Sequence, residues 1–125
     1  MSICEADLLT LGEALAQAPD ELHWRASIGR SYYAGYHTAQ RWHSQLASPG
    51  SAGPAKGMHS VLINSLTNPT VGGALRNKSK SIGYMVNTTR ALRVKADYHL
   101  AEAVDQAEAM STAAFAAKVC AAASS

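Results

Sequence analysis

The chain has 125 residues, a length at which one hydrophobic core can close but a second could not close independently, so we expect a single domain over residues 1–125. Hydrophobic residues make up 47% of the chain, aromatic residues 6% and charged residues 16%, a balance typical of helices packed through small residues rather than of disorder. The net charge of +2 is too small for a dedicated nucleic-acid-binding surface, so any RNA contact has to be local.

The start of the sequence has no basic segment followed by an apolar stretch, and no apolar run approaches the ~20 residues that span a bilayer. These features predict a cytoplasmic protein without a membrane-spanning segment. The two cysteines, Cys4 and Cys120, lack metal-ligand spacing and predict free thiols in a reducing compartment, with a disulfide between the chain ends as the alternative.

The first half of the chain predicts two helices. Apolar residues recur at helical spacing in EADLLTLGEALAQA, residues 5–18, which stops at the turn signal Pro19-Asp20. Asp20 is the expected N-cap of a long second helix running to about Ala47, because its carboxylate can accept hydrogen bonds from the first-turn amides and Glu21 suits the helix dipole. The segment SPGSAGPAKG, residues 48–57, predicts a flexible loop, and its glycines match no phosphate-binding pattern.

The second half predicts three further helical segments and no sheet. GMHSVLINSLTN, residues 57–68, reads as a short helix ending before Pro69, and residues 70–100 continue as a fourth segment whose glycines blur its boundaries. A last, alanine-rich helix is expected from about Glu102 to Ala122. Its expected apolar stripe is Val104, Ala107, Met110 or Ala114, Phe115 and Val119. Nothing alternates with period two, so the expected fold class is an all-α, up-and-down bundle of four to five helices.

The long second helix has two different faces. Seven apolar or small residues fall within a sector about 80° wide and form the expected core stripe. They are Trp24, Ile28, Tyr32, Gly35, Ala39, Trp42 and Leu46. Arg30 and His37 lie opposite, about 20° apart around the helix and roughly 10 Å apart along it, with Ala34 and Arg41 on the same side. Such residues meet either solvent or another subunit.

Ala34 is expected to leave an open notch between Arg30 and His37 that could admit a phosphate. The competing interpretation is an ordinary exposed face, because such faces commonly collect arginine and histidine. The tyrosines beside the pair also have two interpretations. Packing at the edge of the core is favoured for Tyr33 and Tyr36 over stacking on RNA bases.

Three segments resemble the HEPN family in order and spacing. RSYYAGYHTA resembles the family's SRAYYAAFHAA, GMHSVLINSL resembles its segment containing Lys-Thr-His-Ser, and LRVKADYHL, residues 92–100, resembles its Leu-Arg-x-x-Ala-Asp-Tyr signature. Together they cover roughly residues 26–100. The resemblance implies a HEPN-like helical bundle that forms a homodimer through the second helix.

The resemblance also implies an activity. Family members that cleave RNA carry an arginine, four to six residues and a histidine, and Arg30 and His37 match the longest spacing. By this resemblance, two such pairs line one cleft of a dimer, and cleavage needs neither metal nor cofactor. His37 would be the acid or base and Arg30 the phosphate clamp. Ser31 stands where nuclease members commonly carry Asn, Asp or His, and Ala39 replaces a tyrosine that a nucleotidyltransferase modifies in one toxin subgroup.

Arg93, Asp97 and Tyr98 are expected to be a fold signature that locks the last two helices onto the second. Alternatively, Asp97 orients Arg30 or another basic residue through a charge-assisted hydrogen bond. The segment RNKSK, residues 76–80, is either a solvated helix face or a contact for the RNA backbone. The candidate RNA- or nucleotide-binding residues are Ser31, Tyr33, Arg41, Arg76, Lys78 and Lys80. The other histidines lack ligand spacing, so no metal site is expected.

Three hypotheses for the function follow. The first is a homodimeric, metal-independent endoribonuclease that acts as a toxin or defence effector, with a nucleotidyltransferase-type antitoxin as partner. The second is a non-catalytic HEPN accessory subunit that binds a nucleotide or a partner within a nucleotidyltransferase or defence system. The third is a purely structural dimer contact at the Arg30 and His37 face.

Overall fold

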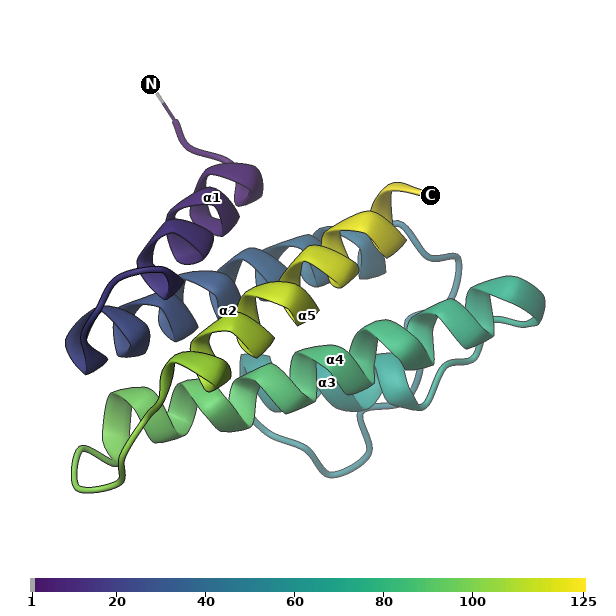
Figure 1. The fold of residues 1–125 in the computed structure, drawn as a ribbon. Coiled ribbons are helices and arrows are strands. Elements are labelled where there is room, and N and C mark those ends of the chain that lie inside the picture. The colour runs from purple at the N-terminus through teal and green to yellow at the C-terminus, as the bar shows by residue number, and fades with distance from the viewer. Residues whose placement is uncertain (1) are drawn as a thin grey trace.

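The structure is a computed structural model that describes residues 2–125. Five helices follow one another within residues 2–125 (Figure 1). They are α1 (Glu5–Ala16), α2 (Glu21–His43), α3 (Met58–Thr67), α4 (Gly73–Tyr98) and α5 (Gln106–Ser124). Residues 2–125 contain no strand, which confirms the predicted all-α class. None of the helices in this part of the chain is long and apolar enough to cross a bilayer.

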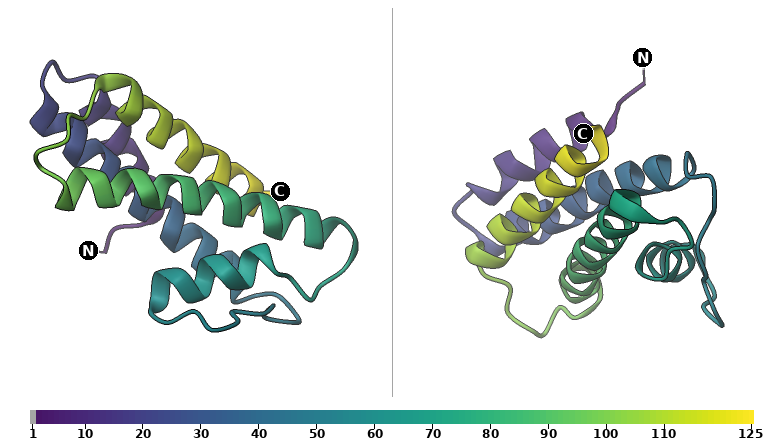
Figure 2. Two further views of the ribbon diagram at one scale, coloured as in Figure 1. Left: turned by 90° about the horizontal axis from the view of Figure 1, so that it is seen from below. Right: turned by 90° about the vertical axis from the view of Figure 1, so that its right-hand side faces the viewer.

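The helix α2 lies at the centre of the bundle, in contact with α1, α4 and α5. The right-hand view of Figure 2 places α1 and α3 on opposite sides of the molecule, with α3 packed on α4. Asp20 caps α2 as predicted, because its carboxylate accepts a hydrogen bond from the His23 backbone N–H at 3.0 Å. The predicted α2 was too long, since the helix ends at His43 and the loop begins there.

The predicted core stripe of α2 is confirmed. Ile28, Tyr32 and Ala39 are fully buried and Trp42 is 8% exposed, while the two end members of the stripe, Trp24 and Leu46, pack partly buried against the core. One cluster joins α2 to α3, α4 and α5 through residues such as Tyr32. A second cluster around Ile28 closes the end of the bundle where α4 turns into α5.

A second face of α2 is also buried, because α1 packs closely against it. Ser27 Oγ donates a hydrogen bond of 2.6 Å to the Gly12 carbonyl, and a Cβ atom on Gly12 would fall closer than 3.0 Å to Ser31 Oγ. Ala34 continues this stripe and is 0% exposed. The predicted open notch at Ala34 is therefore wrong, because the helical wheel assumed one buried face and α2 has two.

The predicted apolar stripe of α5 is wrong in most positions. Ala107, Met110 and Ala114 are exposed, Phe115 is half-buried, and only the end members of the predicted stripe are buried. The buried face of the helix is Ala109, Thr112, Ala113, Ala116 and Val119. Alanine on every side gives the sequence little contrast between faces, so periodicity could not choose one.

The connection from α4 to α5 is fixed by α2. The Arg25 guanidinium donates a 2.9 Å hydrogen bond to the Ala96 carbonyl and also faces the carbonyls of Lys95, His99, Leu100 and Glu102. These are carbonyls at and beyond the last turn of α4, which lack partners within the helix. α5 starts only at Gln106, after Asp105, which caps it together with Glu108.

Candidate functional site

Arg30 and His37 are both exposed on the outer side of α2, as the sequence predicts. They open onto different grooves of the chain. Arg30 lines one groove with residues from the start of α2 and the end of α4, including Asp97. His37 lines another groove with the start of α1. Tyr33 lies between them, one helical turn from each, so a single chain does not bring the two groups into one pocket.

The groove at Arg30 has a volume of about 360 Å³ and contains three charged side chains. Two of them are already engaged: Arg25 with the end of α4 and Asp97 with Arg93 at 2.9 Å. The six ion pairs formed within residues 2–125 do not include Arg30. Its guanidinium is thus the cation of this groove that is available to an anion.

His37 belongs to a cluster of aromatic rings. Its imidazole stacks on the Tyr33 ring, with centroids 5.8 Å apart and an angle of 30° between the planes. Tyr36 stacks on His59 of α3 at 4.4 Å, and Tyr32 Oη shares a 2.5 Å hydrogen bond with His59 Nδ1. The Tyr36 hydroxyl is buried without a hydrogen-bond partner within residues 2–125. The predicted packing role of Tyr33 and Tyr36 is confirmed, although the packing includes the candidate catalytic imidazole.

Burial sets the protonation states in this cluster. It raises the pKa of Tyr32 and of Tyr36, so both hydroxyls stay protonated at neutral pH. It also lowers the pKa of His59, helped by the nearby positive charges of Arg90 and Arg93. His59 is therefore neutral at neutral pH, which suits its hydrogen bond with the Tyr32 hydroxyl.

Arg93 of α4 lies against the same rings. Its Cζ atom is 5.3 Å from the ring centres of Tyr33 and Tyr98, and its Nε donates to Asp97 Oδ2 at 2.9 Å. Partial burial disfavours its charge, but Tyr33, Tyr98 and Asp97 raise the pKa of Arg93 overall. Asp97 thus orients a basic residue, as one hypothesis expected, but this residue is Arg93 and not Arg30.

The three segments that resemble HEPN motifs therefore meet in space. The rings from α2 contact His59 of the second segment and Arg93 of the third. His59 is not among the site residues that the sequence predicts, because it belongs to the histidines that lack metal-ligand spacing. The sequence signal for His59 is its position inside GMHSVLINSL, the second of the three segments that resemble HEPN motifs. Its spacing to the other histidines carries no such signal. Within residues 2–125, no group of three or more His, Cys, Asp or Glu side chains is arranged for a metal ion.

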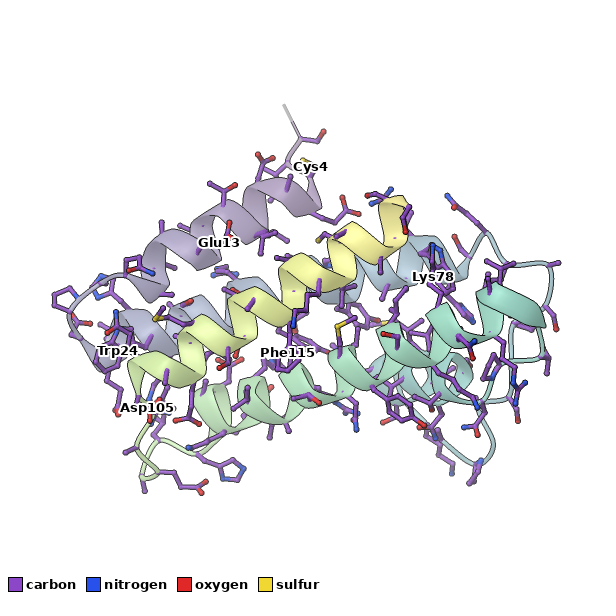
Figure 3. All side chains as sticks on the ribbon, turned by 45° about the vertical axis from the view of Figure 1, so that its right-hand side comes forward. Cys4, Glu13, Trp24, Lys78, Asp105 and Phe115 are labelled. Carbon is purple, nitrogen blue, oxygen red and sulfur yellow. The ribbon has the colours of Figure 1, made fainter. Side chains whose placement is uncertain are left out.

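The basic segment of α4 lies away from this cluster. Arg76 donates to the Pro69 carbonyl at 3.0 Å and Lys78 donates to the Ser125 carbonyl at 2.8 Å. Lys80, which is partly buried, precedes Asp97 by 17 positions, which is about 25 Å along a helix. Figure 3 shows Lys78 at the opposite end of the bundle from Trp24. Arg30 follows Trp24 by six positions in α2, which is about 9 Å along the helix. The cations near the rings are instead Arg90 and Arg93.

The remaining predicted binding residues have different environments. Arg41 is 60% exposed and its Nε donates to Glu5 Oε1 at 3.0 Å, beside His37. Ser31 is 0% exposed and lies under Gly12 of α1. A binding role for Ser31 is therefore wrong, because its hydroxyl is covered by the neighbouring helix.

Both cysteines are free thiols, as predicted, and they line one small pocket between the start of α1 and the end of α5.

No protein-family model, no curated protein and no solved structure matches this chain.

Proposed function

We propose that the chain is a HEPN-type, metal-independent endoribonuclease, a toxin or defence effector that acts as a homodimer. One observation carries the proposal: Arg30, a cation outside the ion pairs of residues 2–125, and His37 are both exposed on the outer side of α2, flanking Tyr33. The motif resemblance and the helical bundle support it further. RNA supplies both groups that these side chains recognise, a phosphate and a ribose hydroxyl.

The chemistry requires only these two side chains. His37 accepts the proton of the ribose 2′-hydroxyl while water protonates the departing 5′-oxygen, or it donates a proton to that oxygen while water accepts the proton of the 2′-hydroxyl. The 2′-oxygen attacks phosphorus and the bond from phosphorus to the 5′-oxygen breaks, which leaves a 2′,3′-cyclic phosphate and a 5′-hydroxyl. Arg30 binds the non-bridging phosphate oxygens and stabilises the charge that develops on them.

Dimerisation explains how two separate grooves can serve one phosphate. In a two-fold dimer formed through the outer face of α2, antiparallel helices place Arg30 of one copy beside His37 of the other, and the reverse. Exposed apolar side chains of the Arg30 groove and of the end of α4 support such an interface. Leu22, Tyr98 and Leu100 are 76%, 66% and 74% exposed, respectively.

Cleavage by the purified protein in the presence of EDTA tests the proposal. We expect the unmodified chain to give products that end in 2′,3′-cyclic phosphate. We expect His37→Ala and Arg30→Ala each to abolish cleavage. His23→Ala is the matched control, since His23 is another exposed histidine of α2 and lies in its first turn. If RNA remains intact with the unmodified protein, or if the two variants cleave normally, the proposal is wrong.

Mixing the two inactive variants tests whether the site is shared. In a mixed dimer, one site receives both substitutions and the other receives none. Random exchange makes about half of the dimers mixed, so about a quarter of the full activity should return. If each site used Arg30 and His37 from the same chain, mixing would restore nothing.

A second candidate is the non-catalytic accessory subunit of a nucleotidyltransferase or defence system. It is favoured by the observation that Arg30 and His37 line separate grooves in one chain. This candidate predicts binding of a nucleotide or a protein partner that Arg30→Ala weakens, with no RNA turnover under any condition.

A further inference from the structure

The groove beside His37 has a defined shape and chemistry. It is formed by the start of α1 and the last turns of α2, and its volume is about 700 Å³, within the range of about 300–1,000 Å³ for small-molecule sites. We call it the α1–α2 groove. Its lining residues include Ile3, Glu5, Leu8, His37, Gln40 and Arg41.

The two walls of the α1–α2 groove differ in polarity. The α2 wall consists of His37, Gln40, Arg41 and Ser44. These residues are spaced three, four and seven positions after His37 and therefore share one helical face. Among them, the exposed Gln40 offers both a donor and an acceptor through its amide. The other wall contributes the apolar side chains of Leu8 in α1 and of Ile3, which precedes α1 and is 71% exposed. A flat group with apolar faces and a hydrogen-bonding edge would match both walls.

The charges in the groove favour an uncharged occupant. Glu5 lies in the groove and is paired with Arg41 at 3.0 Å, so the positive charge of Arg41 is already balanced. A backbone hydrogen bond and Arg41 lower the pKa of Glu5, and its carboxylate therefore stays ionised at neutral pH. A phosphate inside this groove would therefore find no guanidinium outside an ion pair, whereas the groove at Arg30 contains a guanidinium that takes part in none of the ion pairs of residues 2–125.

We propose that the α1–α2 groove binds a nucleobase of single-stranded RNA, namely the base of a nucleotide joined to the phosphate that His37 serves. Gln40 forms hydrogen bonds with the edge of the base, and Ile3 and Leu8 pack against its face. The inference rests on the proposed function, because His37 at the side of the groove links the base to the reacting phosphate. It adds a residue, Gln40, that selects the sequence at the cleavage position.

Binding of uncleavable oligonucleotides tests this site separately from cleavage. The probes are a labelled four-nucleotide strand with 2′-O-methyl groups, which has no nucleophile, and the same strand with one base removed at each position in turn. Fluorescence anisotropy should show that one of these removals weakens binding several-fold. Gln40→Ala should weaken binding of the complete strand by about three- to tenfold, and should not weaken binding of the strand that lacks the selected base.

The control variant is Gln45→Ala, because Gln45 is also exposed and lies just beyond α2 but does not line the groove. A second variant, Gln40→Glu, keeps the shape of the side chain and removes its donor. It should change which base is preferred. Circular dichroism of each variant establishes that the helices remain.

The outcomes separate the two proposals. Base-dependent binding without any cleavage of ordinary RNA would retain the base site and reject the nuclease. Cleavage that Gln40→Ala and base removal leave unchanged would retain the nuclease and reject the base site. Absence of binding, or equal binding of the complete and base-deleted strands, would likewise overturn the base site. So would equal effects of Gln40→Ala and Gln45→Ala.

Discussion

The close contact between α1 and α2 leads to a quantitative prediction at Gly12. A Cβ atom on Gly12 would lie closer than 3.0 Å to Ser31 Oγ, 3.1 Å from the Ser31 backbone N and 3.3 Å from its Cα atom. Gly12→Ala therefore overpacks the helix pair, which costs about 1–3 kcal/mol. Alanine gains roughly 1 kcal/mol over glycine within a helix, so the net loss in the free energy of unfolding should be up to about 2 kcal/mol, and the loss relative to a glycine-to-alanine change without a clash should be about 1–3 kcal/mol.

Ser31→Ala should reverse most of that loss. The Ser31 hydroxyl is buried without a hydrogen-bond partner within residues 2–125, so its removal alone should be neutral or slightly stabilising. Removal also eliminates the closest overlap with the new methyl group. The double variant should thus be near the stability of the unmodified chain, with a coupling energy of about 1–2 kcal/mol between the two positions.

Urea denaturation followed by circular dichroism measures these differences. Gly29→Ala is the matched control, because its Cβ atom would meet only Asp97 Oδ1 at 3.9 Å and should give the helix gain without the clash. Two results would show that α1 does not cover Ser31. One is that Gly12→Ala is as stable as the control, and the other is that Ser31→Ala changes the free energy of unfolding equally in the unmodified chain and in the Gly12→Ala variant. Ser31 would then be open again as a binding residue.

Three further predictions concern α2 and its contacts. Arg25→Ala should lower the free energy of unfolding in urea by about 2–4 kcal/mol, because the end of α4 loses a charged donor, and Arg25→Lys should recover only part of this. The pKa of His59 lies below its ordinary value of 6.5, so the unfolded chain binds the proton first. Stability should fall as the pH drops below about 6.5, and His59→Gln should flatten this dependence. Tyr33→Ala should shift the NMR signal of the His37 ring protons, whereas Tyr33→Phe should preserve it; equal shifts in both variants would exclude stacking as the cause.

The sequence predicted those parts of the fold in which neighbouring positions differ strongly in polarity. In α2, bulky residues such as Ile28 and Tyr32 repeat at helical spacing against polar neighbours, and they are buried as expected. In α5, alanine occupies both buried and exposed positions, such as Ala113 and Ala114. There the choice of face is made by how closely α5 can approach α2, which depends on the three-dimensional arrangement.

The close approach of α1 did leave a signal in the sequence. Ser27, Ser31, Ala34 and Thr38 form a row of small residues at spacings of four, three and four, which is a second face of the same helix. Together with Gly12 in the preceding helix, the row indicates a close helix neighbour rather than an open notch. A helical wheel that asks only where large apolar residues lie cannot detect such a face.

The candidate site shows why a motif cannot be divided into fold residues and functional residues. From the sequence, Arg93 and Asp97 belong to a fold signature and His37 to the chemistry. In the structure, Asp97 binds Arg93, Arg93 lies over Tyr33, and Tyr33 stacks on His37. A change at Arg93 would therefore alter both packing and the position of the imidazole. Stability measurements on such variants must accompany activity measurements, because loss of activity alone would not tell which of the two effects caused it.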